Sequence, residues 1–135
     1  MTSPITEAEI ARVVPAFYAQ VRRDPMLGPI FNSAIGDWPH HLQKLQAFWS
    51  SVMLASGRYK GQPMPAHIRH AAQITPAAFA RWLELWGETT DAMLTPEAAA
   101  AMQEKAARIA ESLALGIRYD RERRENTGPV AAQAI

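Results

Sequence analysis

Two histidines and two polar aromatic residues are the side chains of this chain best suited to do chemistry. His67 ends a short stretch rich in proline and glycine, residues 59–67, and His41 lies near the start of a strongly apolar helical pattern. Tyr18 and Trp82 belong to two further helical patterns, and each carries a hydrogen-bond donor at the end of an apolar ring. An imidazole can bind a metal ion, and O–H and N–H donors can stabilise negative charge on a ligand. These four residues predict a buried prosthetic group that a protein side chain binds on one side, while polar side chains face the reaction on the other side.

His67 is a candidate metal ligand, although a histidine in an arbitrary loop usually lies at the surface. Prolines stiffen this loop, and large apolar helices are expected on both sides of it, so the loop can present one imidazole to the interior. His70 follows three residues later and could compete for the role. The pairs His40–His41 and His67–His70 could also suggest zinc, but no carboxylate lies at helical spacing to complete such a site.

The other three candidates also have plain structural readings. His41 would be a core or boundary histidine in most helices with this pattern. Tyr18 could pack its ring and send its hydroxyl to water, and Trp82, four residues before Trp86, would usually belong to the core. A buried indole must place its N–H against an acceptor, which is informative about function only where the acceptor is a ligand.

Four strong helical patterns must position these residues, and no alternating pattern is long enough for a strand. Thr6 and Glu9 form a capping-box pair at the start of the first pattern. Pro15 predicts that this first pattern is divided into two helices. The patterns cover residues 7–22, residues 38–54 after a cap at Asp37, residues 75–93 and residues 95–117. The predicted fold is all-α.

Shorter segments connect these helices. Residues 24–27 predict a turn that a Gly-Pro pair ends, and Phe31 then points inward from a loop. Phe31 could be plain core packing or could line a ligand pocket. Residues 56–66 predict a loop with at most one helical turn, because two glycines and two prolines disfavour a long regular helix there.

The composition excludes several classes of function. Hydrophobic residues make up 48% and charged residues 20% of the chain, with a net charge of +1, which favours neither nucleic acid nor an anionic membrane as a partner. No cysteine is present, so disulfides, thiolate metal sites and thioether-linked cofactors are excluded. The absence of cysteine, of a signal-peptide pattern and of a membrane-spanning apolar run favours a cytoplasmic protein. The length predicts one domain, residues 1–120, followed by a flexible C-terminal tail, residues 121–135.

Five segments in order resemble the group III truncated haemoglobins. They are residues 17–32, 38–42, 48–49, 59–67 and 79–83. Each segment alone is weak, but five in this order with similar spacing are fairly specific, and the resemblance covers roughly residues 8–118. The resemblance implies a 2-on-2 helical sandwich that encloses one non-covalent haem b.

The resemblance also implies roles for individual residues. His67 would be the proximal iron ligand, and the distal residues that hydrogen-bond a bound ligand would be Tyr18, His41 and Trp82. The implied pocket walls are Phe31, Leu45, Phe48 and Trp49. Since the haem propionates need solvent or a cation, we expect one of Lys44 and Arg69 to lie near a propionate. His70, a second histidine in the proximal region, departs from the pattern of the family.

The expected function is a haem protein that binds dioxygen, nitric oxide and carbon monoxide. Several distal donors favour redox chemistry on dioxygen, nitric oxide or peroxide, of the nitric oxide dioxygenase or peroxidase type, with an unidentified reductase. One alternative is a non-catalytic globin for oxygen binding, storage, transport or sensing. A haem-free helical interaction domain is the third alternative. No phosphate-binding loop, nucleophile elbow or metalloprotease motif suggests another enzyme.

Overall fold

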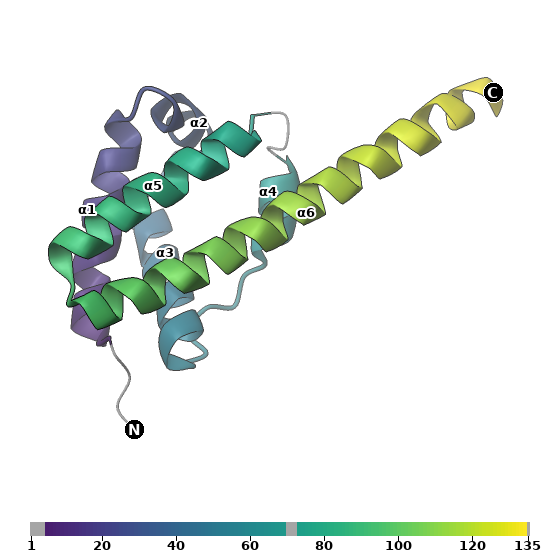
Figure 1. The fold of residues 1–135 in the computed structure, drawn as a ribbon. Helices are drawn as coiled ribbons and strands as arrows, with labels where there is room; N and C mark the ends of the chain where they lie inside the picture. Colours follow the sequence, from purple (N-terminus) through teal and green to yellow (C-terminus); the bar gives the residue numbers. More distant parts are fainter. Residues whose placement is uncertain (1–4, 70–72, 135) are drawn as a thin grey trace.

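The protein is all-α, as the sequence predicted, and a single long helix dominates its outline (Figure 1). The computed structural model describes residues 5–69 and 73–134, and within these ranges it leaves out the side chains of residues 66, 68, 69 and 126–134. None of the described residues lies in a strand. The helices in the described part of the chain are α1 (Glu7–Arg23), α2 (Leu27–Ala34), α3 (Trp38–Leu54), α4 (Pro63–Arg69), α5 (Pro76–Met93) and α6 (Pro96–Ala134).

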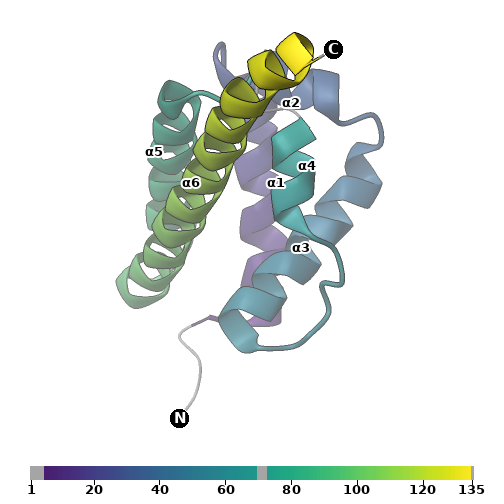
Figure 2. The same ribbon diagram turned by 90° about the vertical axis from the view of Figure 1, so that its right-hand side faces the viewer.

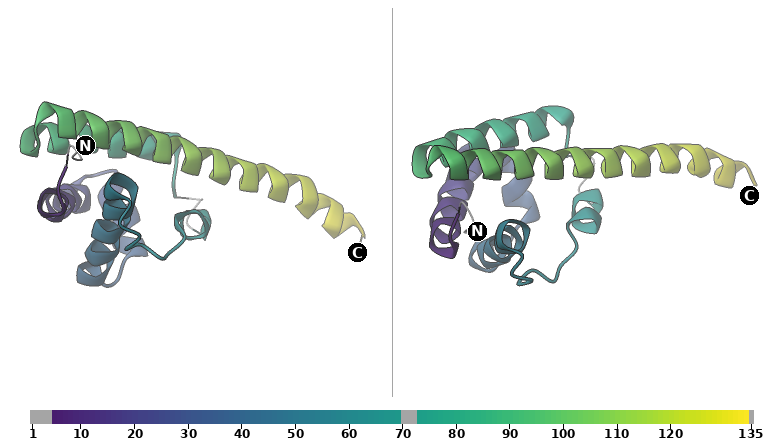
Figure 3. Two further views of the ribbon diagram at one scale, coloured as in Figure 1. Left: turned by 90° about the horizontal axis from the view of Figure 1, so that it is seen from below. Right: turned by 60° about the horizontal axis from the view of Figure 1, so that its bottom comes forward.

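The four long helices form two pairs that cross each other. Helices α5 and α6 run side by side as one layer, and α1 with α3 forms the second layer (Figures 1 and 3). Helix α1 also packs on α5 and therefore joins the two layers. The short helices α2 and α4 lie at the margins, where α2 packs on α1 and α5 and α4 packs on α6 (Figure 2). This arrangement is the predicted helical sandwich of two pairs.

Helix α1 is one continuous helix, which corrects the prediction that Pro15 would divide it. A proline inside a helix removes one backbone hydrogen bond and costs about 3 kcal/mol or more. The buried face continues through Pro15: Val13 and Val14 before it, and Phe17 and Tyr18 after it, are all buried. Burying several apolar side chains stabilises by about 1.5–3 kcal/mol each, which outweighs the cost of the proline.

Two segments predicted as loops are helical. Phe31 lies within α2, which continues past the Gly-Pro pair that was expected to end the turn, because a proline is tolerated in the first turn of a helix. His67 lies within α4 for the same reason, since Pro63 and Pro65 fall in its first turn. Both side chains therefore project from short helices, which fix their directions more firmly than loops would.

Predicted caps begin the long helices. Glu9 N–H donates to Thr6 Oγ1 at 3.2 Å and Thr6 N–H donates to Glu9 Oε1 at 3.0 Å, which confirms the capping box. The backbone N–H of His40 donates to the carboxylate of Asp37 at 3.1 Å at the start of α3. Threonine hydroxyls accept in the same way ahead of α5 and α6. These local hydrogen bonds set where each helix begins.

The centre of the core consists of large rings. Phe17, Trp49 and Trp86 are fully buried, and Trp86 lies between the other two. The indole N–H of Trp86 donates to the carbonyl oxygen of Met102 on α6 at 3.2 Å, so this buried donor is satisfied within the protein. Rings from α1, α3 and α5 therefore contact one another next to Met102 of α6 and hold the two layers together.

Helix α6 runs on through residues 121–134, where the sequence predicted an irregular tail. Residues 121–125 are exposed, and the second half of the helix projects beyond the rest of the molecule (Figure 1). Ion pairs at helical spacing support it, such as Arg118 with Glu122 at 3.2 Å and Arg124 with Asp120 at 2.9 Å. The division into a domain over residues 1–120 and a flexible tail after it stays a prediction.

Candidate functional site

Tyr18 and Trp82 meet on one side of the molecule, although α1 and α5 carry them. Tyr18 is buried, whereas Trp82 is half-buried. The pKa of the Tyr18 hydroxyl is raised to about 12. Burial is the larger cause and raises the pKa, whereas a side-chain hydrogen bond with Trp82 lowers it by less. A hydrogen bond lowers the pKa of an acid when the partner donates to its oxygen, so the indole N–H of Trp82 donates to Tyr18. The hydroxyl proton of Tyr18 is then available to another acceptor.

Aromatic side chains surround the Tyr18 ring. Phe17 packs edge-on against it with ring centres 4.7 Å apart, and Phe31 and Trp38 lie at 5.9 and 6.1 Å. Phe31 reaches Tyr18 from α2 and is half-buried, so the inward direction predicted for it is observed. These rings exclude water from the hydroxyl and explain why burial is the main influence on its pKa.

His41 extends this side of the molecule along α3. It is half-buried and lies edge-on to Trp38, with ring centres 5.8 Å apart. Burial lowers the pKa of His41, and the charges of Lys44, His40 and His67 lower it further. His41 is therefore neutral at neutral pH, when it offers one N–H donor and one acceptor nitrogen.

His67 is prepared as a ligand by its own helix. Its Nδ1 lies 2.7 Å from the carbonyl oxygen of Pro63, one turn earlier in α4. A carbonyl oxygen can only accept, so Nδ1 carries a proton, and the neutral form of the ring then has its lone pair on Nε2. Metal-binding histidines are commonly held in this way by a carbonyl on the far nitrogen. His70, the competing candidate, lies outside the described residues.

Helix α3 presents an apolar ridge that its neighbours leave half-exposed. Its buried residues are only Trp38, Trp49 and Ser50. The residues of the ridge that are packed against the core but only partly buried include Leu42, Leu45, Phe48, Val52 and Met53. Helix α3 packs chiefly on α1, and α4 packs chiefly on α6, so among the described residues no further helix packs closely on this ridge. Leu45 and Phe48 thus have the exposure expected of pocket walls.

Trp49 differs from the other predicted pocket walls. It is only 1% exposed and its ring stacks on Trp86 at 4.6 Å, in the centre of the core. Phe48, its neighbour, lies edge-on to it at 5.7 Å and occupies a half-buried position on the ridge. Trp49 therefore supports Phe48 from behind, and a direct role for Trp49 in the pocket stays a prediction.

The site fits a planar apolar group bound by one imidazole. His67 is one of the electrostatic influences that lower the pKa of His41, so the two imidazoles lie in the same part of the molecule. The half-buried ridge of α3 and the Tyr18–Trp82 pair border that region with apolar surface and few donors. Haem combines a wide apolar ring, an iron that takes one imidazole, and a reactive face that donors can serve.

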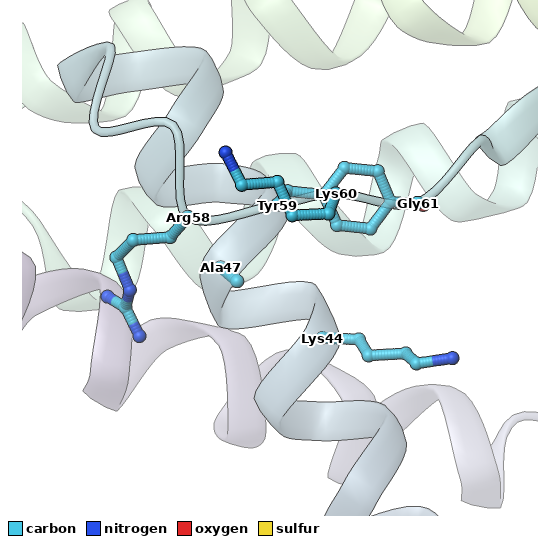
Figure 4. A pocket seen from close by; sticks show the side chains of 6 residues that line it. All are labelled: Lys44, Ala47, Arg58, Tyr59, Lys60 and Gly61. Atoms are coloured by element: carbon cyan, nitrogen blue, oxygen red, sulfur yellow. The ribbon is translucent and has the colours of Figure 1, made fainter.

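A basic surface pocket of about 200 Å³ lies beside the ridge and holds Lys44 (Figure 4). Lys44 is exposed on α3, three residues after His41, where the sequence placed it as a cation for a propionate. The side chain of Arg69, the other candidate, lies outside the described part of the structure. Among residues 5–69 and 73–134, no three His, Cys, Asp or Glu side chains gather closely enough to hold a metal ion. His70, which belongs to one of the two histidine pairs behind the zinc alternative, lies outside the described residues, so that alternative stays untested.

Sequence reasoning missed the ion pair that ties α5 to the end of α1, next to the Tyr18–Trp82 pair. Arg81 Nε donates to Asp24 at 2.8 Å, and the same carboxylate accepts the N–H groups of Met26 and Leu27. Asp24 precedes a proline, and aspartate in such a position favours a turn in which its carboxylate accepts nearby backbone N–H groups. The sequence therefore indicated the local hydrogen bonds of Asp24. Nothing in the sequence indicated that its partner would lie on α5, next to Trp82.

An all-helical sandwich that carries a helix-held imidazole, together with a buried tyrosine hydrogen-bonded to a half-buried tryptophan, is typical of a globin. Comparison with known proteins agrees, although no family model matches the chain. The chain is 34% identical over 110 residues to the group 3 truncated haemoglobin ctb of Campylobacter jejuni, covering 78% of this chain and 86% of that protein. A crystal structure of group III truncated haemoglobin from Campylobacter jejuni superposes with a TM-score of 0.73 at 34% identity, covering 81% of this chain and 88% of that one.

The chain therefore belongs to the group III truncated haemoglobins, which confirms the resemblance seen in the sequence. Membership implies a globin that binds haem and gaseous ligands. Within the described residues, no helix has the length and apolar character needed to cross a bilayer.

Proposed function

We propose that this chain binds one non-covalent haem b through His67 and performs redox chemistry on dioxygen, nitric oxide or a peroxide. The chain contains no cysteine that could form a thioether link to the cofactor, which supports the non-covalent form. His67 supports the assignment of the ligand, because its hydrogen bond to Pro63 leaves Nε2 free for iron. When bound, haem supplies a redox-active iron at which such small molecules can react.

The observation that carries the redox assignment is the pairing of Tyr18 with Trp82. Because Trp82 donates to the Tyr18 oxygen, it fixes the hydroxyl and leaves the Tyr18 proton for an oxygen atom of the substrate. With a pKa of about 12, Tyr18 stays protonated and remains a donor throughout the physiological pH range. Donors fixed in a dry pocket stabilise negative charge that develops during reaction, by about 1–3 kcal/mol each.

His41 adds a third polar group on the same side. Burial and nearby cationic groups lower the pKa of His41, so its imidazole is mostly neutral at neutral pH. A neutral imidazole can donate one proton and accept another, so His41 can pass a proton between solvent and substrate. Such chemistry needs an electron source, for which we propose a reductase in the cytoplasm, a compartment that the cysteine-free composition fits.

Two measurements test this proposal. Titration of the purified chain with haem should give a Soret band that saturates at one haem per chain, whereas a haem-free interaction domain would give none. The dioxygen-saturated ferrous protein should then be mixed with nitric oxide while nitrate is measured, with a peroxidase assay beside it. Activity no higher than that of free haem in both assays would reject the redox function and leave oxygen binding, storage, transport or sensing.

A further inference from the structure

Three tryptophans form a continuous stack from the distal side into the core. The rings of Trp82 and Trp86 are 5.9 Å apart and only 2° from parallel. Trp86 and Trp49 follow at 4.6 Å and 16°. The first ring is hydrogen-bonded to Tyr18, and the other two are fully buried. One end of the stack therefore lies at the distal site.

The other end of the stack leads toward the surface through two more rings. Phe48 lies edge-on to Trp49 at 5.7 Å, and Tyr59 lies edge-on to Phe48 at 5.2 Å. Tyr59 is half-buried, in the loop that follows α3. One phenyl ring thus separates the last indole from a phenol that reaches solvent. We call Trp82, Trp86, Trp49, Phe48 and Tyr59 the ring series.

The geometry of the stack differs from that of the other ring contacts in this core. Phe17 meets Tyr18, Trp82 and Trp86 at interplanar angles of 75–86°, as edge-to-face packing favours. Among the ring contacts of the described residues, the indole pairs are the ones close to parallel, so that one ring face adjoins the next. Indole and phenol are also the uncharged side chains that lose one electron most readily. A row of parallel indoles with a phenol near its end is suited to passing a one-electron oxidation from ring to ring.

Tyr59 lies in the basic surface pocket of Figure 4. Lys44, Arg58 and Lys60 line this pocket, and none of its six lining residues is acidic. Arg58 is paired with Glu7 at 2.6 Å. Lys60 has no ion-pair partner among the described residues, so the pocket keeps a positive charge beside the phenol even where Lys44 pairs with a propionate. Such a pocket attracts small anions at low ionic strength.

We propose that the ring series carries oxidising equivalents from the distal site to Tyr59, where an anionic enediol such as ascorbate is oxidised. This inference rests on the proposed redox function, with a peroxide as the oxidant. The electron vacancy passes from Trp82 through Trp86 and Trp49 to Tyr59, which releases its phenol proton to solvent. The ascorbate monoanion then returns one electron and one proton to the tyrosyl oxygen and leaves as the ascorbyl radical anion. Two such transfers supply the two electrons that reduce one peroxide to water, and the two protons released to solvent balance those consumed.

The transfer can be tested without any reaction of peroxide, in the haem-loaded full chain with carbon monoxide on the iron. Azide radicals made by pulse radiolysis oxidise indoles, and the absorption of the tryptophan radical should decay as that of the tyrosyl radical grows. The growth should be first order and independent of protein concentration. Tyr59→Phe should remove this intramolecular growth, whereas Tyr119→Phe, which changes an exposed tyrosine outside the series, should leave it intact.

Two outcomes of this experiment would overturn the transfer along the ring series. The first is equal tyrosyl growth in Tyr59→Phe and in the unsubstituted protein. The second is loss of the growth in Tyr119→Phe alone. Trp86→Phe provides a second check, provided that circular dichroism shows the native fold, and it should slow the growth because it interrupts the stack. Unchanged growth in a folded Trp86→Phe protein would also contradict the proposal. Because peroxide is absent, these results do not depend on whether the proposed function holds.

The choice of reductant is tested with peroxide present. Ascorbate and uncharged hydroquinone should be compared as electron donors for the protein, for Lys60→Gln and for Lys105→Gln, an exposed lysine on α6. Lys60→Gln and added salt should slow ascorbate oxidation several-fold and leave hydroquinone oxidation unchanged, because only the anion is attracted. Lys105→Gln should resemble the unsubstituted protein with both donors. Equal effects of Lys60→Gln on the two donors, or no effect on either, would reject the anionic reductant.

Discussion

Arg81 Nε donates to Asp24 Oδ1 at 2.8 Å and thereby ties α5 to the end of α1. Asp24 is buried at the C-terminus of the helix that carries Tyr18, and Arg81 directly precedes Trp82. The same carboxylate accepts two backbone N–H groups at the start of α2, at 3.0 and 3.1 Å. One carboxylate therefore sets the relative positions of the three helices that surround the Tyr18 ring.

The first prediction concerns this carboxylate. Asp24→Ala should lower the free energy of unfolding by about 1–3 kcal/mol, because it leaves two N–H groups and a guanidinium without their acceptor. Chemical denaturation followed by circular dichroism measures the change. Glu84→Gln is the matched control, since Glu84 is a mostly exposed second partner of Arg81 and should change stability little. Equal losses in both variants would mean that Asp24 has no special role.

The second prediction is the pH dependence of this stabilisation. Burial alone would raise the pKa of Asp24, but hydrogen bonds from Leu27, Arg81 and Met26 outweigh it, so the native pKa is lowered. The unfolded chain then binds more protons in the range between the two pKa values, and stability rises with pH there. The contribution should be complete above about pH 4, be lost as the pH falls toward the native pKa, and be absent from Asp24→Asn. Acid titrations of both proteins that superimpose would contradict this.

The third prediction concerns the iron ligand. His67→Ala should abolish stable haem binding, and added imidazole should restore a bound spectrum, because the substitution removes the imidazole that Pro63 holds in place through Nδ1. His70→Ala should leave the Soret band and the haem stoichiometry nearly unchanged. Absorption spectra during haem titration check both variants. Loss of haem in His70→Ala, with retention in His67→Ala, would move the proximal assignment to His70.

The fourth prediction concerns the distal pair. Tyr18→Phe should speed dioxygen dissociation about tenfold or more, because it removes a donor worth on the order of 1–3 kcal/mol. Trp82→Phe should act in the same direction through Tyr18, since the indole N–H donates to the Tyr18 oxygen. The double variant should therefore resemble Tyr18→Phe rather than the product of the two effects. Stopped-flow measurement gives the rates, and carbon monoxide serves as the less polar control ligand. Unchanged dioxygen rates in both single variants would make these residues simple core packing.

The fifth prediction concerns the propionates. Lys44→Met should weaken haem affinity by no more than about 1 kcal/mol, because an exposed ion pair contributes little. Transfer of haem to an excess of apomyoglobin measures the rate of loss. Lys105→Met, an equally exposed substitution on α6, should not change that rate. A haem-bound crystal structure with Lys44 turned away from both propionates would reject the contact.

The sequence by itself determined the class of fold, the family and the helix starts. Apolar periodicity requires helices that bury one face, and side-chain caps act within one turn, so both can be read locally. The capping box of Thr6 and Glu9 is such a case. His67, His41, Tyr18 and Trp82 could be selected because their residue types and order match a known family.

Only the tertiary structure decided how the local conflicts were resolved and which side chains meet. Pro15 lies within a continuous helix because the buried face on both sides of it outweighs the lost hydrogen bond. Likewise, Trp82 donates to Tyr18, Arg81 pairs with Asp24, and Trp49 stacks on Trp86, although each pair lies far apart in the chain. These contacts depend on how α1, α3 and α5 cross, and the crossing is set by the packing of whole helix faces, which no local pattern specifies.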